Sequence, residues 1–185
     1  MDREFRILSG LHPLYNKVPQ PFLFSDELSI IGTPFYIMER MHGVIFRGHT
    51  PKDQLPDLNQ MRKLSEAFVS TLVEIHSFNY HAAGLENLGR PDGYVNRQIE
   101  GWTKRYIKAK TDEFKPLEKV YTWLNKNIPT EKRSALIHND FKYDNLILSQ
   151  EKSLNIKGIL DWEMATIGDP LMDLGTTLGY WIQES

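Results

Sequence analysis

The segment LIHNDFKYDNLIL, residues 136–148, decides the fold class. Apolar residues at both of its ends flank a polar loop that holds two carboxylates, a lysine and an amide. The loop lacks the Gly or Asn-Gly that usually marks a tight hairpin turn. We therefore predict two short buried strands, at 136–138 and 146–148, that hold a polar loop with a chemical task.

The composition is ordinary for a globular protein. The chain has 185 residues, 41 % hydrophobic and 25 % charged, which suits one domain with its own core. A net charge of −2 argues against a nucleic-acid partner, and the absence of Cys argues against disulfides and thiolate zinc sites. No apolar run approaches the roughly 20 residues of a membrane span, and residues 1–4 do not resemble a signal peptide. We expect a cytoplasmic protein, or an organellar one if a targeting segment precedes this sequence.

Apolar spacing in the rest of the chain predicts several helices and a few short strands. The predicted helices are 3–11, 59–78, 95–109, 116–127 and the last part of 161–185. Strands are predicted at 22–24 and 34–39, as an antiparallel pair, and at 156–160, with a loop over 43–58. The predicted fold class is α+β: a small strand pair joined to a mostly helical part with a short β core.

The polar loop contains the groups that phosphoryl transfer from ATP requires. Asp140 is the candidate base, and Lys142 is the candidate cation for the transferred phosphate. Asn145, five residues after the base, and Asp161, after a separate apolar strand, are candidate Mg²⁺ ligands. The spacing H-x-D-x-x-x-x-N followed by a strand-end Asp is typical of a kinase-like catalytic loop.

These two segments carry a family resemblance. LIHNDFKYDNLIL and ILDWEMATIGDPLMDLG resemble the signature blocks of the aminoglycoside/choline phosphotransferase-like kinases, which have a protein-kinase-like fold. The resemblance implies a partial small lobe at 1–42 and a large lobe at 43–185 that is incomplete at its C-terminus. It also implies that Glu4 pairs with an ATP-binding Lys and that the backbone of Glu39 and Met41 binds adenine.

A narrower resemblance is to the kinase-like domain found with acyl-CoA dehydrogenases, carried by IIGTPFYIMERMHGVIFR, GLENLGRPDGYVNRQIEGWTKRY and WLNKNIP. It implies a small-molecule hydroxyl acceptor of the hydroxyacyl-CoA type and an acyl-CoA dehydrogenase as a possible partner. Gln98, Trp102 and Arg105 are then candidate residues of the acceptor pocket, although core packing also accounts for Trp102.

The chain departs from the family pattern in three ways. Asn139 stands where Gly is usual, and Lys142 stands where Arg is commoner. The chain also starts at the Glu-bearing helix, without a Gly-rich loop or a strand carrying the ATP-phosphate Lys. We therefore expect it to be the middle of a longer kinase.

The leading hypothesis is an ATP- and Mg²⁺-dependent small-molecule kinase. The alternatives are an inactive kinase-like fragment or nucleotide-binding module, and a metal-dependent phosphohydrolase built on His138, Asp140 and Asp161. We expect other polar residues of this region to have structural roles: support of the loop by His138, Glu163 and Asp173, turn capping by Asp144, helix N-capping by Asp169, and packing or capping by His76.

Overall fold

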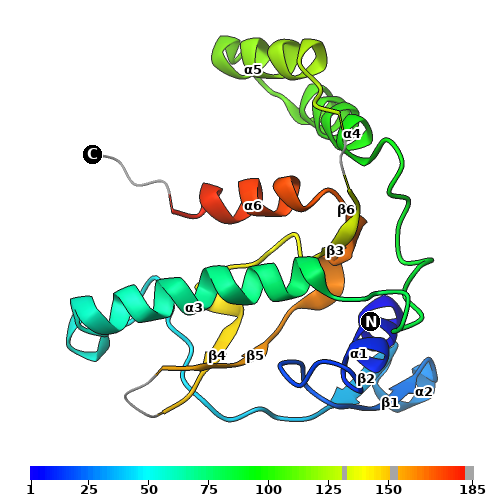
Figure 1. Ribbon diagram of the computed structural model, residues 1–185. Coiled ribbons are helices and arrows are strands. Elements are labelled where there is room, and N and C mark those ends of the chain that lie inside the picture. The colour runs from blue at the N-terminus through cyan, green and yellow to red at the C-terminus, as the bar shows by residue number, and fades with distance from the viewer. Residues whose placement is uncertain (131–132, 151–153, 182–185) are drawn as a thin grey trace.

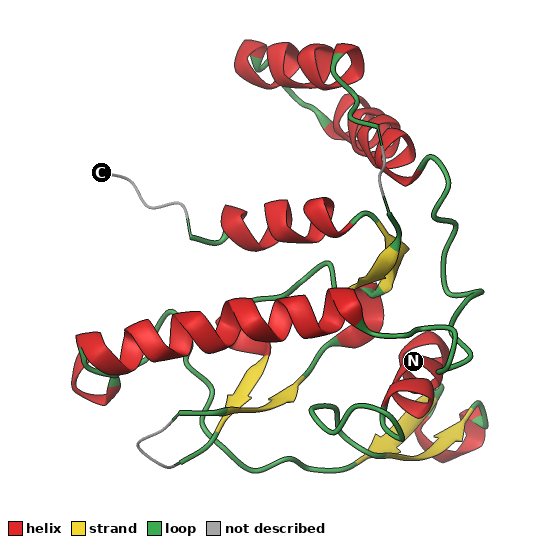
Figure 2. Cartoon of the chain, viewed as in Figure 1, coloured by secondary structure: helices red, strands yellow, loops and turns green. Residues whose placement is uncertain are grey.

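The computed structural model describes residues 1–130, 133–150 and 154–181, and its architecture is α+β (Figures 1 and 2). The helices are α1 (Asp2–Leu11), α2 (Leu28–Ile31), α3 (Leu58–Ser77), α4 (Tyr94–Ala109), α5 (Lys115–Lys126) and α6 (Pro170–Gly179). The strands are β1 (Pro21–Ser25), β2 (Phe35–Met38), β3 (Ala135–Ile137), β4 (Leu146–Leu148), β5 (Ile156–Ile159) and β6 (Thr166–Gly168). Single turns of 3-10 helix lie at η1 (Lys52–Gln54), η2 (Tyr143–Asn145) and η3 (Trp162–Met164).

The strands form three antiparallel pairs, β1 with β2, β3 with β6 and β4 with β5. The predicted pairing of the first two strands is confirmed, with Phe24 opposite Tyr36. The two strands that flank the polar loop, β3 and β4, belong to different pairs. The polar loop therefore spans from one pair to the other.

A single buried cluster joins the elements around this loop. It contains Leu8 of α1, Phe68 of α3, Leu146 of β4 and Trp162 of η3, which are between 0 and 1 % exposed. The apolar face of α3 recurs at three- and four-residue steps, as predicted, and Asp57 and Gln60 cap its start with a reciprocal capping box. Helix α1, from the predicted small lobe, shares this core with elements of the predicted large lobe. The boundary between the lobes at residue 42 stays a prediction.

The other elements lie close to their predicted positions, with a few differences. The strand predicted at 136–138 ends at Ile137, so His138 already belongs to the loop. The four-residue helix α2, which Glu27 caps and Gly32 ends, was not predicted, and neither was β6. The closing helix ends at Gly179, and residues 182–185 lie outside the described residues.

Helices α4 and α5 pack on each other and project from the rest of the chain, above α6 in Figure 1. Within the described ranges, no helix combines the length and the apolar character needed to span a bilayer.

Candidate active site

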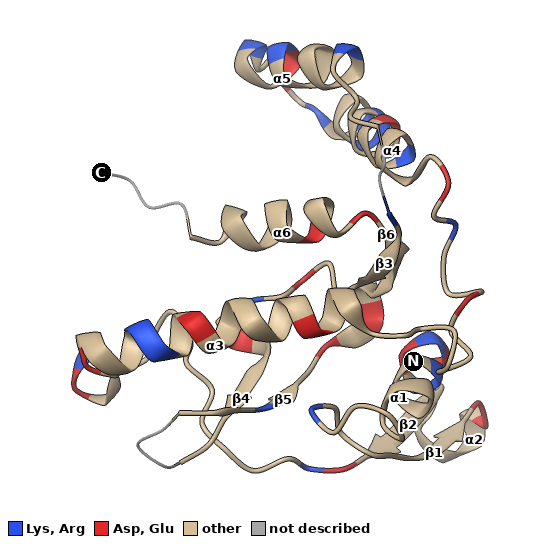
Figure 3. Cartoon of the chain, in the orientation of Figure 1, with Lys and Arg blue, Asp and Glu red and all other residues tan. Residues whose placement is uncertain are grey.

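Two loops lie side by side because of the way the strands pair. The first runs from the end of β3 to the start of β4, and the second runs from the end of β5 to the start of β6. Ile137 is opposite Thr166, and Leu146 is opposite Ile159, so both ends of the two loops are adjacent. The two loops therefore begin and end next to each other, and both carry acidic positions, drawn red in Figure 3.

Hydrogen bonds join the two loops directly. The N–H of Leu160 donates to the carbonyl of Asn145 at 2.9 Å. The Nε2 of His138 lies 3.0 Å from the carbonyl oxygen of Leu160, and its Nδ1 accepts from the N–H of Asp140 at 3.3 Å. Burial lowers the pKa of His138 below its usual value. Both ring nitrogens of this neutral histidine are thus used within the loops, so it is poorly placed to bind a metal.

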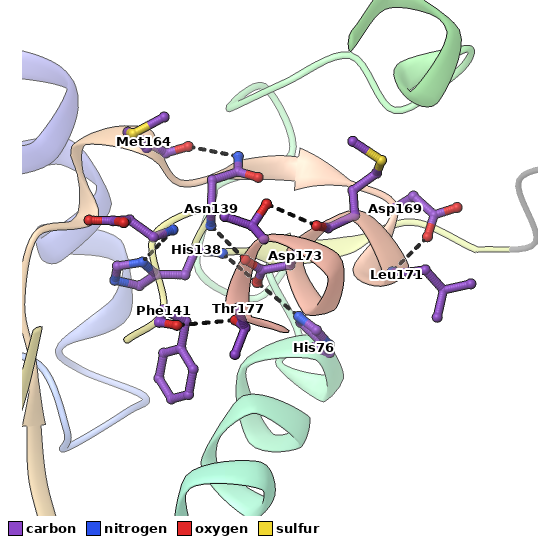
Figure 4. Close-up of polar contacts among 12 residues, drawn as sticks. His76, His138, Asn139, Phe141, Met164, Asp169, Leu171, Asp173 and Thr177 are labelled. Carbon is purple, nitrogen blue, oxygen red and sulfur yellow. Dashed lines mark hydrogen bonds and ion pairs between the residues drawn. The ribbon is translucent and has the colours of Figure 1, made fainter. Parts of the chain in front are cut away.

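Asp173 of α6 fixes the start of the first loop (Figure 4). Its carboxylate accepts from the backbone N–H of His138 at 2.9 Å and from that of Asn139 at 2.7 Å. The Nε2 of His76, at the end of α3, lies 2.9 Å from the same carboxylate. Asp173 is 0 % exposed, so these contacts replace the water that a buried carboxylate would lose. The bond from His76 was not predicted from the sequence, because its partner lies 97 residues away.

Asn139 occupies the position where the family pattern has Gly, and its backbone conformation explains why Gly is usual there. Its φ is 65°, in the left-handed region that Gly adopts freely and that Asn adopts more readily than most residues. The side chain also donates to the carbonyl of Met164 in the second loop at 3.0 Å. Asn therefore satisfies the backbone requirement and adds a link between the loops.

Asp140 lies at the centre of a set of hydrogen-bond donors. Lys142 Nζ is 2.9 Å from Oδ1 and 2.8 Å from Oδ2, and Asn145 Nδ2 donates to Oδ2 at 2.9 Å. The hydroxyl of Tyr180, just beyond α6, donates to Oδ1. Burial alone would raise the pKa of Asp140, but the hydrogen bonds from Lys142, Tyr180 and Asn145 lower it below its ordinary value. Asp140 is therefore an ionised carboxylate at neutral pH.

Lys142 has a matching environment. Its hydrogen bond to Asp140 raises its pKa above the usual value, and its Nζ lies 4.9 Å from the centre of the Tyr180 ring. The ammonium group is thus held charged beside the carboxylate.

Asn145 and Asp161 lie at the same end of the β4–β5 pair, where the N–H of Leu160 bonds to the carbonyl of Asn145. Asn145 immediately precedes β4, and Asp161 follows Leu160 at the end of β5 with a left-handed φ of 66°. The Nδ2 of Asn145 donates to both the carbonyl and the side chain of Asp140, so Oδ1 is its free ligand atom. An amide oxygen and a carboxylate are the hard oxygen donors that Mg²⁺ prefers.

Nearby groups show that carboxylates concentrate at this point. Burial raises the pKa of Tyr36, and the hydrogen bond to Glu4 and the charges of Asp161 and Glu163 raise it further. Glu4 also accepts from the N–H of Trp162 at 3.2 Å and so supports the residue after Asp161. The residues present fit a divalent cation that is also bound by phosphate oxygens. They do not form a complete protein cage, since the described part of the chain has no group of three or more His, Cys, Asp or Glu that could hold a metal.

The predicted adenine-binding segment follows β2. The N–H of Glu39 donates to the carbonyl of Gln20 at 2.7 Å, which leaves its carbonyl as the group able to accept from a base. A side chain added at Gly158 of β5 would lie 2.6 Å from the sulfur of Met41. Met41 therefore lies against the same strand that leads to Asp161.

The three predicted acceptor-pocket residues lie on α4. Gln98 and Trp102 line an apolar cavity of about 290 Å³ between α4 and α5, and Met172 of α6 also lines it. Arg105 does not line it, but its guanidinium lies 4.7 Å from the centre of the Trp102 ring. Met172 precedes Asp173, so the cavity adjoins the helix that fixes the first loop.

Comparison with known proteins finds matches that cover the whole chain or nearly all of it. The whole chain, residues 1–185, matches the model of the phosphotransferase enzyme family. It is 36 % identical over 188 residues to acyl-CoA dehydrogenase family member 10 of Mus musculus, covering 100 % of this chain and 17 % of that protein. It is 38 % identical over 177 residues to acyl-CoA dehydrogenase family member 11 of Homo sapiens, covering 94 % of this chain and 22 % of that protein. The chain thus spans about a fifth of the length of these relatives.

Solved structures show the same fold. A protein from Ralstonia eutropha JMP134 assigned as an aminoglycoside phosphotransferase is 28 % identical with a TM-score of 0.86, covering 100 % of this chain and 56 % of that one. Aminoglycoside 2'-phosphotransferase-IIIa in complex with GDP is 20 % identical with a TM-score of 0.68, covering 91 % and 58 %. The predicted kinase-like fold is confirmed, and the chain belongs to the phosphotransferase enzyme family.

Proposed function

We propose that this chain carries the catalytic loop of an ATP- and Mg²⁺-dependent kinase that phosphorylates a hydroxyl group of a small molecule. Two contacts support the proposal: Asn145 donates to Asp140 within the first loop, and Leu160 of the second loop, next to Asp161, donates to the carbonyl of Asn145. Base, cation and two oxygen ligands are needed together for phosphoryl transfer.

Each group then has a defined task. Asp140 accepts the proton of the acceptor hydroxyl, for which it must be ionised. Lys142, held beside Asp140, offsets negative charge on the transferred phosphoryl group. Oδ1 of Asn145 and the carboxylate of Asp161 would hold Mg²⁺, which when bound would neutralise phosphate charge. The carbonyl of Glu39 and the N–H of Met41 bind adenine, and Glu4 supports the loop beyond Asp161.

For the acceptor, we propose a hydroxyacyl-CoA, in particular a 4-hydroxyacyl group. Support comes from two relatives named as acyl-CoA dehydrogenase family members and from the apolar cavity lined by Gln98 and Trp102. An apolar cavity suits an acyl chain better than a polycationic sugar. Arg105, beside Trp102, is the candidate contact for the negatively charged part of such a molecule.

The metal-dependent phosphohydrolase has less support than the kinase. Its proposed ligand His138 uses both ring nitrogens inside the loops. Such sites usually gather several His or carboxylate ligands around two metals, and the described residues lack such a group.

A product assay tests the proposal. The chain is incubated with MgATP and a 4-hydroxyacyl-CoA, the matching acyl-CoA without the hydroxyl, or an aminoglycoside, and the products are identified by mass spectrometry. We expect a phosphorylated product from the hydroxyacyl-CoA alone, because only it combines a hydroxyl with an acyl chain that fits the apolar cavity.

The other outcomes separate the alternatives. Phosphorylation of the aminoglycoside in its place would contradict the proposed acceptor class. Phosphate release with all three compounds and no acceptor product would indicate a phosphohydrolase. Binding of MgATP without any turnover would indicate an inactive module.

A further inference from the structure

The described residues occupy the hydrogen-bond acceptor positions of the Asp140 carboxylate. A carboxylate offers about four lone-pair sites on two oxygens. Lys142 contacts both oxygens, Asn145 donates to Oδ2, and Tyr180 donates to Oδ1. Contacts among the described residues therefore fill all four sites. The hydroxyl of the molecule to be phosphorylated can bond to Asp140 only if one of these donors leaves.

Tyr180 is held at this position by the residues around it. Thr177, one turn earlier on α6 and 1 % exposed, donates to the carbonyl of Phe141 at 3.1 Å. The ring of Trp181 lies 5.1 Å from that of Phe68 and stacks on that of Tyr143 at 6.4 Å with an interplanar angle of 15°. The end of α6 is thus fastened to the catalytic loop on both sides of Tyr180.

Of the three side chains that donate to the Asp140 carboxylate, Tyr180 is the most easily replaced. Asn145 is 8 % exposed and holds Asp140 by two bonds, and Lys142 brings a full charge. Tyr180 is neutral and 50 % exposed, and one hydroxyl hydrogen bond joins it to the carboxylate. A hydroxyl from a bound acceptor can form an equivalent bond at no net loss.

We propose that the Tyr180 hydroxyl occupies the place of the acceptor hydroxyl on Asp140 and leaves it when the acceptor binds. Tyr180 is then a positioning residue that keeps the base covered while no acceptor is present. The inference rests on the proposed role of Asp140 as the base.

The consequence concerns water, the competing acceptor. For water to react, its oxygen bonds to the γ-phosphorus of ATP, the bond to the ADP oxygen breaks, and its proton passes to Asp140. The products are ADP and inorganic phosphate. With Oδ1 covered by Tyr180, water lacks the position from which Asp140 would take its proton. Tyr180 thereby favours transfer to the intended acceptor over loss of ATP to hydrolysis.

Tyr180→Phe tests this in the full 185-residue chain, because it removes the hydroxyl and keeps the ring beside Lys142. Release of inorganic phosphate from MgATP, without an acceptor, is expected to rise about tenfold, the scale of one hydrogen bond to a charged group. The hydrogen bond from Tyr180 lowers the pKa of Asp140, so its loss should raise that pKa. The acid limb of the pH–rate profile is therefore also expected to move to higher pH. A purely structural role would not shift this limb.

Tyr80→Phe is the matched control, since Tyr80 lies in the connection after α3 with its ring on His81; it should change neither rate nor pH profile. An unchanged or lower hydrolysis rate in Tyr180→Phe, while MgATP still stabilises the protein against heat, would overturn the role of Tyr180 alone. If MgATP stabilises neither form, the proposed function fails and the role of Tyr180 fails with it.

Discussion

Asp173→Ala is expected to lower the free energy of unfolding by about 3–5 kcal/mol, the largest stability effect that we predict in this chain. The substitution leaves the N–H groups of His138 and Asn139 and the ring of His76 without their acceptor. Each buried donor left unpaired costs about 1–3 kcal/mol, although not all of it is additive. Urea unfolding followed by circular dichroism measures the change.

Asp169→Ala is the control for this experiment. Asp169 also belongs to the start of α6, and its carboxylate caps the helix by accepting from the N–H of Leu171 at 2.8 Å. Loss of such a cap costs about 1 kcal/mol. Equal losses in the two variants would show that Asp173 acts as an ordinary helix residue and does not anchor the loop.

Asp140→Asn is expected to reduce turnover by about 10²–10⁴-fold, because an amide cannot accept the proton of the acceptor hydroxyl. Affinity for MgATP should change little, since the proposed contacts to nucleotide and metal come from Glu39, Met41, Asn145 and Asp161. Steady-state kinetics on the hydroxyacyl-CoA and calorimetric titration with MgATP separate the two effects.

The pH profile gives a second check on Asp140. Because the folded pKa of Asp140 is lowered, the base stays ionised down to a pH below the ordinary Asp value of about 3.9. Activity limited by this group should therefore persist at neutral and mildly acidic pH and fall only as pH drops through that lowered pKa.

Asp144→Asn is the control for Asp140→Asn. Asp144 is an exposed carboxylate in the same loop, so this variant should keep wild-type turnover. A comparable loss of turnover in Asp140→Asn and Asp144→Asn would contradict a special role for Asp140.

Patterns local to the sequence predicted most of the fold. Helix periodicity predicted α3 and α4, and the residue spacing predicted that Asp140, Asn145 and Asp161 share one site. Such signals are local because the chemistry requires fixed residue types at fixed separations between short strands.

Contacts between distant segments could not be predicted in this way. Tyr180 meets Asp140 across 40 residues, and His76 meets Asp173 across 97. Strand β6 has three residues and is defined by its pairing with β3, so no periodicity could reveal it. The two side-chain contacts depend on how α6 packs on the loop, and β6 depends on its pairing with β3. Neither kind of long-range contact leaves a motif in the sequence.

The central claim is that the two loops form a nucleotide–metal site, and thermal unfolding with and without MgATP tests it most directly. MgATP at about 100 times its dissociation constant should stabilise the wild-type chain by roughly 2.7 kcal/mol. Asp161→Asn should abolish this stabilisation and Asp144→Asn should keep it. No stabilisation of the wild type, or an equal stabilisation of Asp161→Asn, would contradict the account.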